Sequence, residues 1–208
     1  MPVTKHYSII SWTILLVLLA FNLTFAEFLS AHPHAFVTTH FKVIFDDNGV
    51  KGIRVNWVFD EMYSSMTGPE FDLDGDGTFD EKESEQLILL GNESLPDLNY
   101  YTHIEVDGKP HHVQEVENFS ITYENGILEY EFFVPCRILG GSKKHQLKIS
   151  PYDVDLFLAM LLPEIGAVLL ENDDSFDVEL SIAEDPDTLI YFDMIHPIAL
   201  NLQFERKP

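Results

Sequence analysis

Apolar and polar residues alternate along several segments of this chain, and short turn sequences separate them. One alternating segment begins at Phe36 and ends at the turn Asp46-Asp47-Asn48-Gly49, and Val50–Phe59 follows as its expected partner strand. Asparagine–glycine favours the tight turn of a β-hairpin, and Asn125-Gly126 gives the same signal between two later segments. The chain is therefore predicted to be mainly β, as an antiparallel β-sandwich of the immunoglobulin-like type.

The later part of the chain continues this pattern. Leu156–Leu170 is apolar but contains Pro163 and Gly166, which favour two buried strands over one helix. The other expected strands are Tyr101–Val106, Pro110–Val116, Phe119–Tyr123, Ile127–Val134, His145–Ser150, Asp177–Ala183 and Ala199–Phe204.

One or two short helices are expected among these strands. The first is Asp60–Met66, with Asp60 as its N-cap and with Gly68-Pro69 ending it. The second runs from Asp80 to about Leu90, where apolar residues recur at helical spacing. Leu95–Tyr101 is expected to be a further short helix or an irregular connection.

The segment Phe71–Glu83, FDLDGDGTFDEKE, has the spacing of an EF-hand calcium loop, D-x-D-x-D-G-x5-E. Such a loop supplies carboxylates at its first, third and fifth positions and a backbone carbonyl at its seventh. It adds a contact through water at its ninth position and a bidentate glutamate at its twelfth. The predicted calcium ligands are Asp72, Asp74, Asp76, Thr78, Asp80 and Glu83.

Two further residues of this segment have expected structural roles. Gly77 stands where the loop must turn sharply, and Phe79 is expected to anchor the loop to the core. A regular EF-hand has an unbroken entering helix, and Gly68-Pro69 are expected to interrupt it here. We therefore predict a structural calcium clip, inserted at about residues 60–100, and not half of a paired calcium sensor.

The sequence has 208 residues and a formal net charge of −23. This length fits one domain, and residues 32–208 are predicted to form a single β-rich domain. The strongly acidic balance argues against nucleic acid or an anionic membrane surface as a partner and suits the binding of cations.

Residues 1–31 are predicted to be a secretory signal peptide. Ser8–Phe25 is an apolar run behind a short polar start, and small residues follow it. Cleavage after Ala26 and cleavage after Ala31 both fit, and an uncleaved membrane anchor is the alternative. After cleavage the chain is expected to be soluble. Cys136 is its single cysteine, so an exported chain has no internal disulfide, and a buried position is expected for it.

His32-Pro33-His34 is the candidate for a second metal site. Alternate residues of an extended segment face the same side, and imidazole suits nickel, cobalt, copper or zinc. Cleavage after Ala31 would add the amine of His32 as a further ligand, and a loose segment with two idle histidines is the alternative. His111-His112 is expected on a solvated edge strand, and His103 is expected to be structural.

Motifs for nucleophilic catalysis, zinc proteolysis and phosphate binding are missing from the sequence. Acidic pairs are abundant, but in so acidic a chain they do not indicate general acid–base chemistry. The protein is therefore not expected to be an enzyme.

Five stretches together resemble one family of exported bacterial proteins, described as the periplasmic component of an uncharacterised ABC-type transport system. They run in the family's order from His32 to about Phe157. They are HPHAFV, WVFDEMYSSM, FDLDGDGTFDEKE, NYYTHIEVDGK and ISPYDVDLF. The resemblance implies a periplasmic location and, by position, His32 and His34 as the HPH pair. It also implies that Asp72, Asp74, Asp76, Asp80 and Glu83 form the acidic loop.

Members of that family often accompany nickel/cobalt transporters, so the resemblance implies a role in handling divalent metals together with an inner-membrane transporter. Three hypotheses follow. The first is a binding or accessory component that takes a transition metal, with calcium stiffening its loop. The second is a copper enzyme with an N-terminal histidine chelate, and the third is a structural adaptor whose one ligand is calcium.

Overall fold

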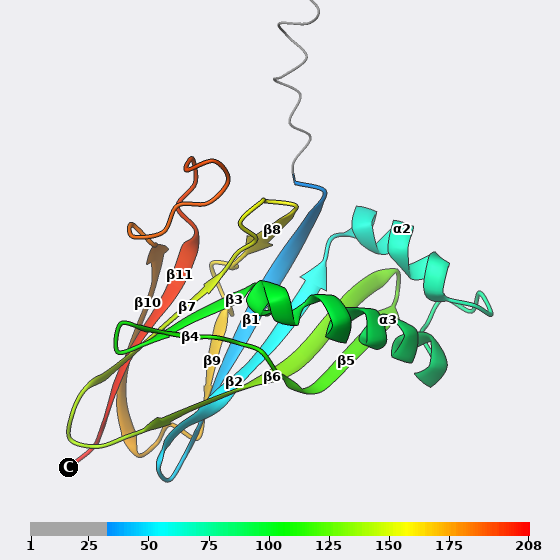
Figure 1. The fold of residues 1–208 in the computed structure, drawn as a ribbon. Helices are drawn as coiled ribbons and strands as arrows, with labels where there is room; N and C mark the ends of the chain where they lie inside the picture. Colours follow the sequence, from blue (N-terminus) through cyan, green and yellow to red (C-terminus); the bar gives the residue numbers. More distant parts are fainter. Residues whose placement is uncertain (1–32) are drawn as a thin grey trace, which may run out of the picture. The chain divides into compact units, whose positions relative to one another are not determined.

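The computed structural model describes Pro33–Pro208, in which two β-sheets form the body of the protein (Figure 1). The six-stranded sheet has the order β5-β6-β2-β1-β8, and β9 also pairs with β1. The five-stranded sheet has the order β10-β11-β7-β3-β4. The mainly β prediction is therefore confirmed. The predicted signal peptide and His32 lie outside the described residues.

The six-stranded sheet is built from two hairpins and two short strands. Both hairpins turn where the sequence predicts: the first at Asp47-Asn48, with Gly49 already paired with Asp46, and the second at Asn125-Gly126. The strands are β1 (Ala35–Asp46), β2 (Gly49–Phe59), β5 (Glu117–Glu124), β6 (Ile127–Leu139), β8 (Leu158–Leu161) and β9 (Val168–Glu171).

Strands β8 and β9 correct the prediction of a wholly antiparallel fold, because both run parallel to β1. The chain leaves the other sheet at the end of β7 and crosses to the free edge of β1, and such a crossover permits parallel pairing. The apolar segment Leu156–Leu170 does contain two short strands, as predicted. Both are only partly buried, because they form the edge of the sheet.

The five-stranded sheet is antiparallel throughout. Its hairpin β3–β4 turns at Asp107-Gly108, and β4 ends at His111, well before the predicted end at Val116. The strands are β3 (Thr102–Val106), β4 (Lys109–His111), β7 (His145–Pro151), β10 (Phe176–Glu184) and β11 (Ile198–Arg206).

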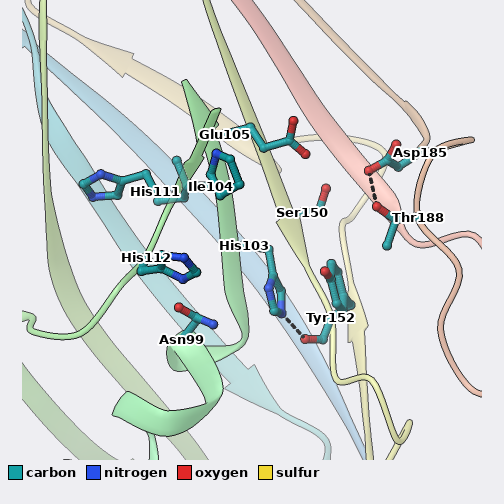
Figure 2. Close-up of a pocket in the computed structure, with 11 residues that line it drawn as sticks. Asn99, His103, Ile104, Glu105, His111, His112, Ser150, Tyr152, Asp185 and Thr188 are labelled. Carbon is teal, nitrogen blue, oxygen red and sulfur yellow. Dashed lines mark hydrogen bonds between the residues drawn. The ribbon is translucent and has the colours of Figure 1, made fainter. Parts of the chain in front are cut away.

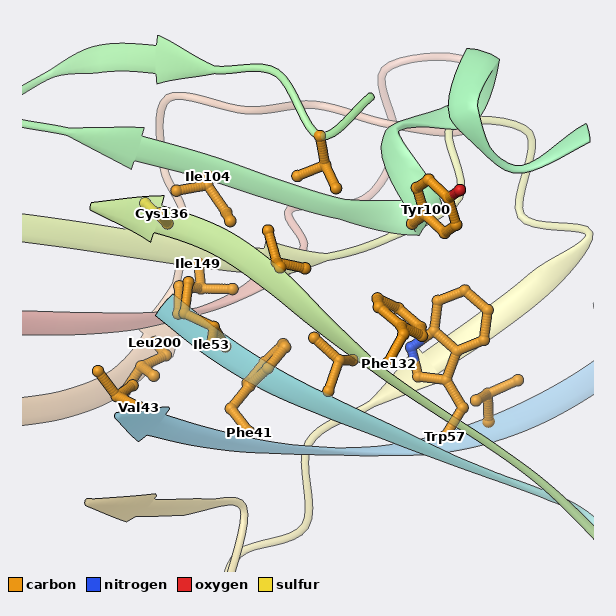
Figure 3. Packing of buried hydrophobic residues seen from close by; sticks show 14 of the residues in the cluster. Phe41, Val43, Ile53, Trp57, Tyr100, Ile104, Phe132, Cys136, Ile149 and Leu200 are labelled. Atoms are coloured by element: carbon orange, nitrogen blue, oxygen red, sulfur yellow. The ribbon is translucent and has the colours of Figure 1, made fainter. Parts of the chain in front are cut away.

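The core lies between the two sheets, which contribute side chains from facing surfaces (Figure 3). The ring of Phe45 on β1 packs edge-on against Phe204 on β11, with 5.4 Å between ring centroids. Cys136 is 1% exposed in this core, so its predicted burial is confirmed. Burial raises the pKa of its thiol to about 11, which keeps the sulfur protonated and unreactive.

Two α-helices and a 3₁₀ helix follow β2 and lie over the β5–β6 end of the six-stranded sheet (Figure 1). They are α2 (Glu61–Phe71), α3 (Glu81–Ser94) and the 3₁₀ helix Pro96–Tyr101. The buried hydroxyl of Ser64 fixes α2 to β6 by accepting a hydrogen bond from the Leu128 amide at 3.1 Å. In the part of the chain that the structure describes, none of the helices has the length and apolar character needed to cross a membrane.

Helix α2 corrects a second prediction. Asp60 is its N-cap, as predicted, but the helix continues past Gly68-Pro69 to Phe71. Gly68 is buried against Tyr123, and a Cβ there would lie 2.3 Å from the tyrosine ring, so the glycine serves packing and does not end the helix. Pro69 lies in the last turn, where the Asp72 amide still donates to the Gly68 carbonyl at 3.0 Å.

Candidate metal sites

The acidic loop, Asp72–Asp80, connects two continuous helices. Helix α2 ends at Phe71, directly before the loop, and α3 begins at Glu81, directly after it. The prediction of a broken entering helix is therefore wrong, and the chain has an unbroken helix–loop–helix here. Its entering helix persists because tertiary packing against Tyr123 stabilises a segment that local propensity disfavours.

The structure brings three of the predicted ligands together. Oxygen atoms of Asp72, Asp74 and Asp76 all lie within 4.8 Å of one another. Asp72 is half-buried, and its carboxylate accepts hydrogen bonds from the amides of Gly75 at 2.8 Å and Gly77 at 2.9 Å. The loop backbone therefore curls around the first carboxylate and holds the trio close.

Gly77 occupies the predicted turning position of the loop. Its φ of 88° lies in the left-handed region that side chains disfavour, which confirms the reason given for a glycine there. The Thr78 amide and hydroxyl both donate to Asp76 Oδ1 at 2.8 Å. These two bonds hold the Asp76 carboxylate in one orientation.

Glu83 closes the loop from the first turn of α3. It is 4% exposed, and its two carboxylate oxygens accept from the Leu73 amide at 2.6 Å and the Asp80 amide at 2.8 Å. The residue therefore ties the start of the loop to its end. Each oxygen retains acceptor capacity after one hydrogen bond, so this arrangement is compatible with metal ligation.

Asp80 does not join the trio in the structure. Its carboxylate caps α3 by accepting from the amides of Lys82 at 2.8 Å and Glu83 at 3.0 Å. With Glu83 bonding back to the Asp80 amide, the two residues form a capping box. A ninth-position residue that contacts the ion only through water can keep this capping role.

Phe79 anchors the loop to the sheet, as predicted. Its ring packs on Tyr123 with 5.2 Å between centroids, and its amide donates to the Tyr123 carbonyl at 3.2 Å. Tyr123 is the same residue that packs against Gly68 in α2. One side chain near the end of β5 therefore contacts both the entering helix and the loop.

The charge of the loop is uncompensated. Among residues 33–208, none of the salt bridges joins a carboxylate of the loop or of Glu83 to a lysine or arginine. Like charges held a few ångströms apart repel one another, so a bound cation would lower the energy of this arrangement. The donors are hard carboxylate oxygens, which suit calcium better than a transition metal.

His34 is the described member of the HPH pair. Its backbone amide donates to the Phe157 carbonyl at 2.9 Å, and its exposed ring lies 4.6 Å from the Phe157 ring. His32 lies outside the described residues, so the two-histidine site remains a prediction. His34 itself lies at a bend, one residue before β1 begins, so the extended segment assumed for the HPH pair is not seen at His34.

A second group of polar side chains lies on the outer face of the five-stranded sheet (Figure 2). Here His103, His111 and His112 line a pocket of about 170 Å³, which we call the histidine pocket. As predicted, His111 lies on an edge strand, β4, and the exposed His112 follows it directly; both residues line the pocket.

His103 is the most constrained of these histidines. Its ring stacks on Tyr152 at 3.6 Å and 7° between planes, and its Nε2 lies 3.2 Å from the Tyr152 carbonyl oxygen. Burial lowers the pKa of His103, against the opposing effects of the Tyr152 carbonyl and of Asp153. The imidazole is therefore neutral at neutral pH. The structural role predicted for His103 is compatible with this packing, but the sequence did not predict that His103 lines a pocket.

A family profile described as "Protein of unknown function (DUF1007)" matches residues 17–189. The chain belongs to the DUF1007 family. It is also 26% identical over 128 residues to an uncharacterised 15.5 kDa protein in the trpE 3' region of Spirochaeta aurantia, covering 62% of this chain and 91% of that protein. An uncharacterised protein of Haemophilus influenzae is 26% identical over 138 residues, which cover 66% of each chain.

Proposed function

We propose that this protein binds calcium in an EF-hand-like loop and acts as a periplasmic metal-binding protein. The observation that carries the proposal is the convergence of Asp72, Asp74 and Asp76 between two helices, with Glu83 tying the ends of the loop together. The predicted immunoglobulin-like sandwich would be the rigid frame that carries the loop. Calcium would stiffen the helix–loop–helix against β5.

The wider role extends the same proposal. The mature protein would serve as the binding or accessory component of a divalent-metal transporter of the nickel/cobalt type in the inner membrane. It would take a transition metal at His32 and His34. The support for this part is the sequence resemblance and the apolar N-terminal run, together with the exposed ring of His34.

Calcium binding can be tested by thermal unfolding of protein stripped with a chelator. Extracellular calcium modules bind with Kd values of about 10⁻⁴–10⁻³ M. For such a site, about 10 mM calcium stabilises the folded state by about 1.4–2.7 kcal/mol. For a domain of this size, that free energy corresponds to an increase in Tm of about 3–10 °C. Magnesium at the same concentration should have a smaller effect, because it demands a tighter octahedral site.

A matched pair of charge variants identifies the site. Asp74→Asn removes one exposed loop carboxylate and should weaken calcium binding about tenfold, since affinity follows the number of ligand charges. Glu93→Gln removes one exposed carboxylate from the end of α3, outside the loop, and should leave calcium binding unchanged. An unchanged Tm in 10 mM calcium, or equal effects of the two variants, would overturn the proposal.

A further inference from the structure

We propose that the histidine pocket is a binding site for a divalent transition-metal ion of the copper, nickel and zinc class, ligated by the imidazoles of His103 and His112. This site is separate from the acidic loop and from the HPH start. It does not depend on calcium binding.

Strand register places the two histidines beside each other. In the β3–β4 hairpin, Ile104 is opposite His111 and Glu105 is opposite Pro110. His103 and His112 are the next residues on the two chains, directly beyond the last pair of this ladder. Cβ atoms of directly opposed residues lie about 4.5–5.5 Å apart on one face of a sheet. Figure 2 shows both side chains on the same side of the hairpin, with Asn99 close to them.

The hydrogen bond of His103 determines which nitrogen can act as a ligand. A carbonyl oxygen can only accept, so the contact of 3.2 Å to Tyr152 requires hydrogen on Nε2 and leaves the lone pair on Nδ1. Metal-ligating histidines are usually oriented in this way, by donating their second ring N–H to a carbonyl or carboxylate. The stacked Tyr152 ring fixes the orientation further, so His103 is prearranged for ligation.

Ser150 provides an independent observation. It is paired with His103 across the β3–β7 register and lines the same pocket. It is 2% exposed, and its hydroxyl has no hydrogen-bond partner within residues 33–208. A buried hydroxyl without a partner costs about 1–3 kcal/mol. A water molecule on a metal held by the neighbouring histidines would provide the missing hydrogen bond.

The charges around the pocket favour a cation and leave imidazole as its ligand. Lys148 bonds to both Glu105 at 2.5 Å and Asp185 at 2.9 Å, so this trio carries one net negative charge. Both carboxylates are bonded to the lysine, and the histidines add nitrogen donors to the pocket lining. Nitrogen ligands select copper, nickel, cobalt or zinc over calcium or magnesium.

His111 serves as the internal control. Its Nε2 lies 3.2 Å from the Pro135 carbonyl, and its ring points away from the other two histidines in Figure 2. It lies on the same hairpin and adjoins His112 in the sequence. A His111→Ala variant therefore changes the histidine count and the local surface while leaving the proposed ligands in place.

The test is calorimetric titration of the full chain with Cu²⁺, Ni²⁺ and Zn²⁺, in a His32→Ala, His34→Ala background that removes the HPH start. We expect one ion per chain, with copper bound most tightly. His112→Ala and His103→Asn should each weaken binding at least about tenfold, and His111→Ala less than about twofold. Copper electron paramagnetic resonance should show coupling to two nitrogens, reduced to one by His112→Ala.

His112 is exposed, so its substitution should not disturb folding, and the result stays interpretable even if His103→Asn unfolds. Calcium titration of each variant should be unchanged, which separates this proposal from the function of the acidic loop. The proposal is overturned if His112→Ala binds copper as tightly as the parent chain, or if His111→Ala weakens binding equally.

Discussion

Gly68 allows a quantitative prediction, because helix propensity and packing act in opposite directions there. In the interior of an exposed helix, substituting alanine for glycine stabilises the folded state by about 1 kcal/mol. At Gly68 the added Cβ would lie 2.3 Å from two ring atoms of Tyr123, where an ordinary contact is 3.4–4 Å. The ring must therefore move by about an ångström. Overpacking of this kind costs about 1–3 kcal/mol.

The two effects leave Gly68→Ala less stable than the parent by about 1 kcal/mol, which lowers Tm by about 2–4 °C. The variant should also bind calcium more weakly, because the displaced Tyr123 ring supports Phe79 of the loop. If the contact between Tyr123 and Phe79 stabilises the calcium-bound loop by about 1 kcal/mol, its loss increases the Kd for calcium about fivefold. Thermal unfolding with and without calcium measures both effects.

Two further variants test the explanation. Glu70→Ala changes an exposed residue of the same helix and should alter stability by less than about 0.5 kcal/mol. In a Tyr123→Leu background the ring is gone, so Gly68→Ala should there become neutral or stabilising. A parent-background Gly68→Ala variant that is more stable than the parent would refute the packing argument.

Three other predictions concern the core, the sheet surface and the N-terminus. Cys136 should react with a thiol reagent at pH 8 only on unfolding, because burial raises its thiol pKa to about 11. Asp185→Asn should cost about 1–3 kcal/mol of stability in urea unfolding. Burial opposes ionisation of Asp185, but hydrogen bonds from Lys148 and Thr188 prevail and lower the pKa of its carboxyl group. The contribution of Asp185 to the free energy of unfolding is therefore present above pH 3.8 and is lost as the pH falls through the lowered pKa. Intact mass of the exported protein should give a first residue of Glu27 or His32, and a retained N-terminus would instead support the membrane anchor.

The strands could be predicted where the deciding information is local. The turn sequences Asp46-Asp47-Asn48-Gly49 and Asn125-Gly126 favour tight turns, and the residues beside them alternate, so both hairpins follow from a few neighbouring residues. The parallel pairing of β8 and β9 with β1 could not be predicted in this way. It depends on which sheet edge the chain reaches after β7, and no short sequence pattern encodes that choice.

Tertiary contacts explain the errors near the candidate sites. Gly68-Pro69 disfavour a helix locally. The helix nevertheless continues through them, because the ring of Tyr123, on a strand far along the chain, packs against Gly68 where a larger residue would clash. The histidine pocket was within reach of sequence reasoning. A two-residue turn at Asp107-Gly108 pairs Ile104 with His111, so counting outward from the turn makes His103 and His112 the next residues on the two chains.

The position of β1 has a consequence for the order of folding. Its first residue, Ala35, pairs with Leu158, and its later residue Phe41 pairs with Val168, so one edge of this early strand stays open until the chain is nearly complete. Such contacts raise the contact order and slow folding. A chain emerging from the ribosome would therefore hold β1 and β2 as an unfinished hairpin for most of its synthesis.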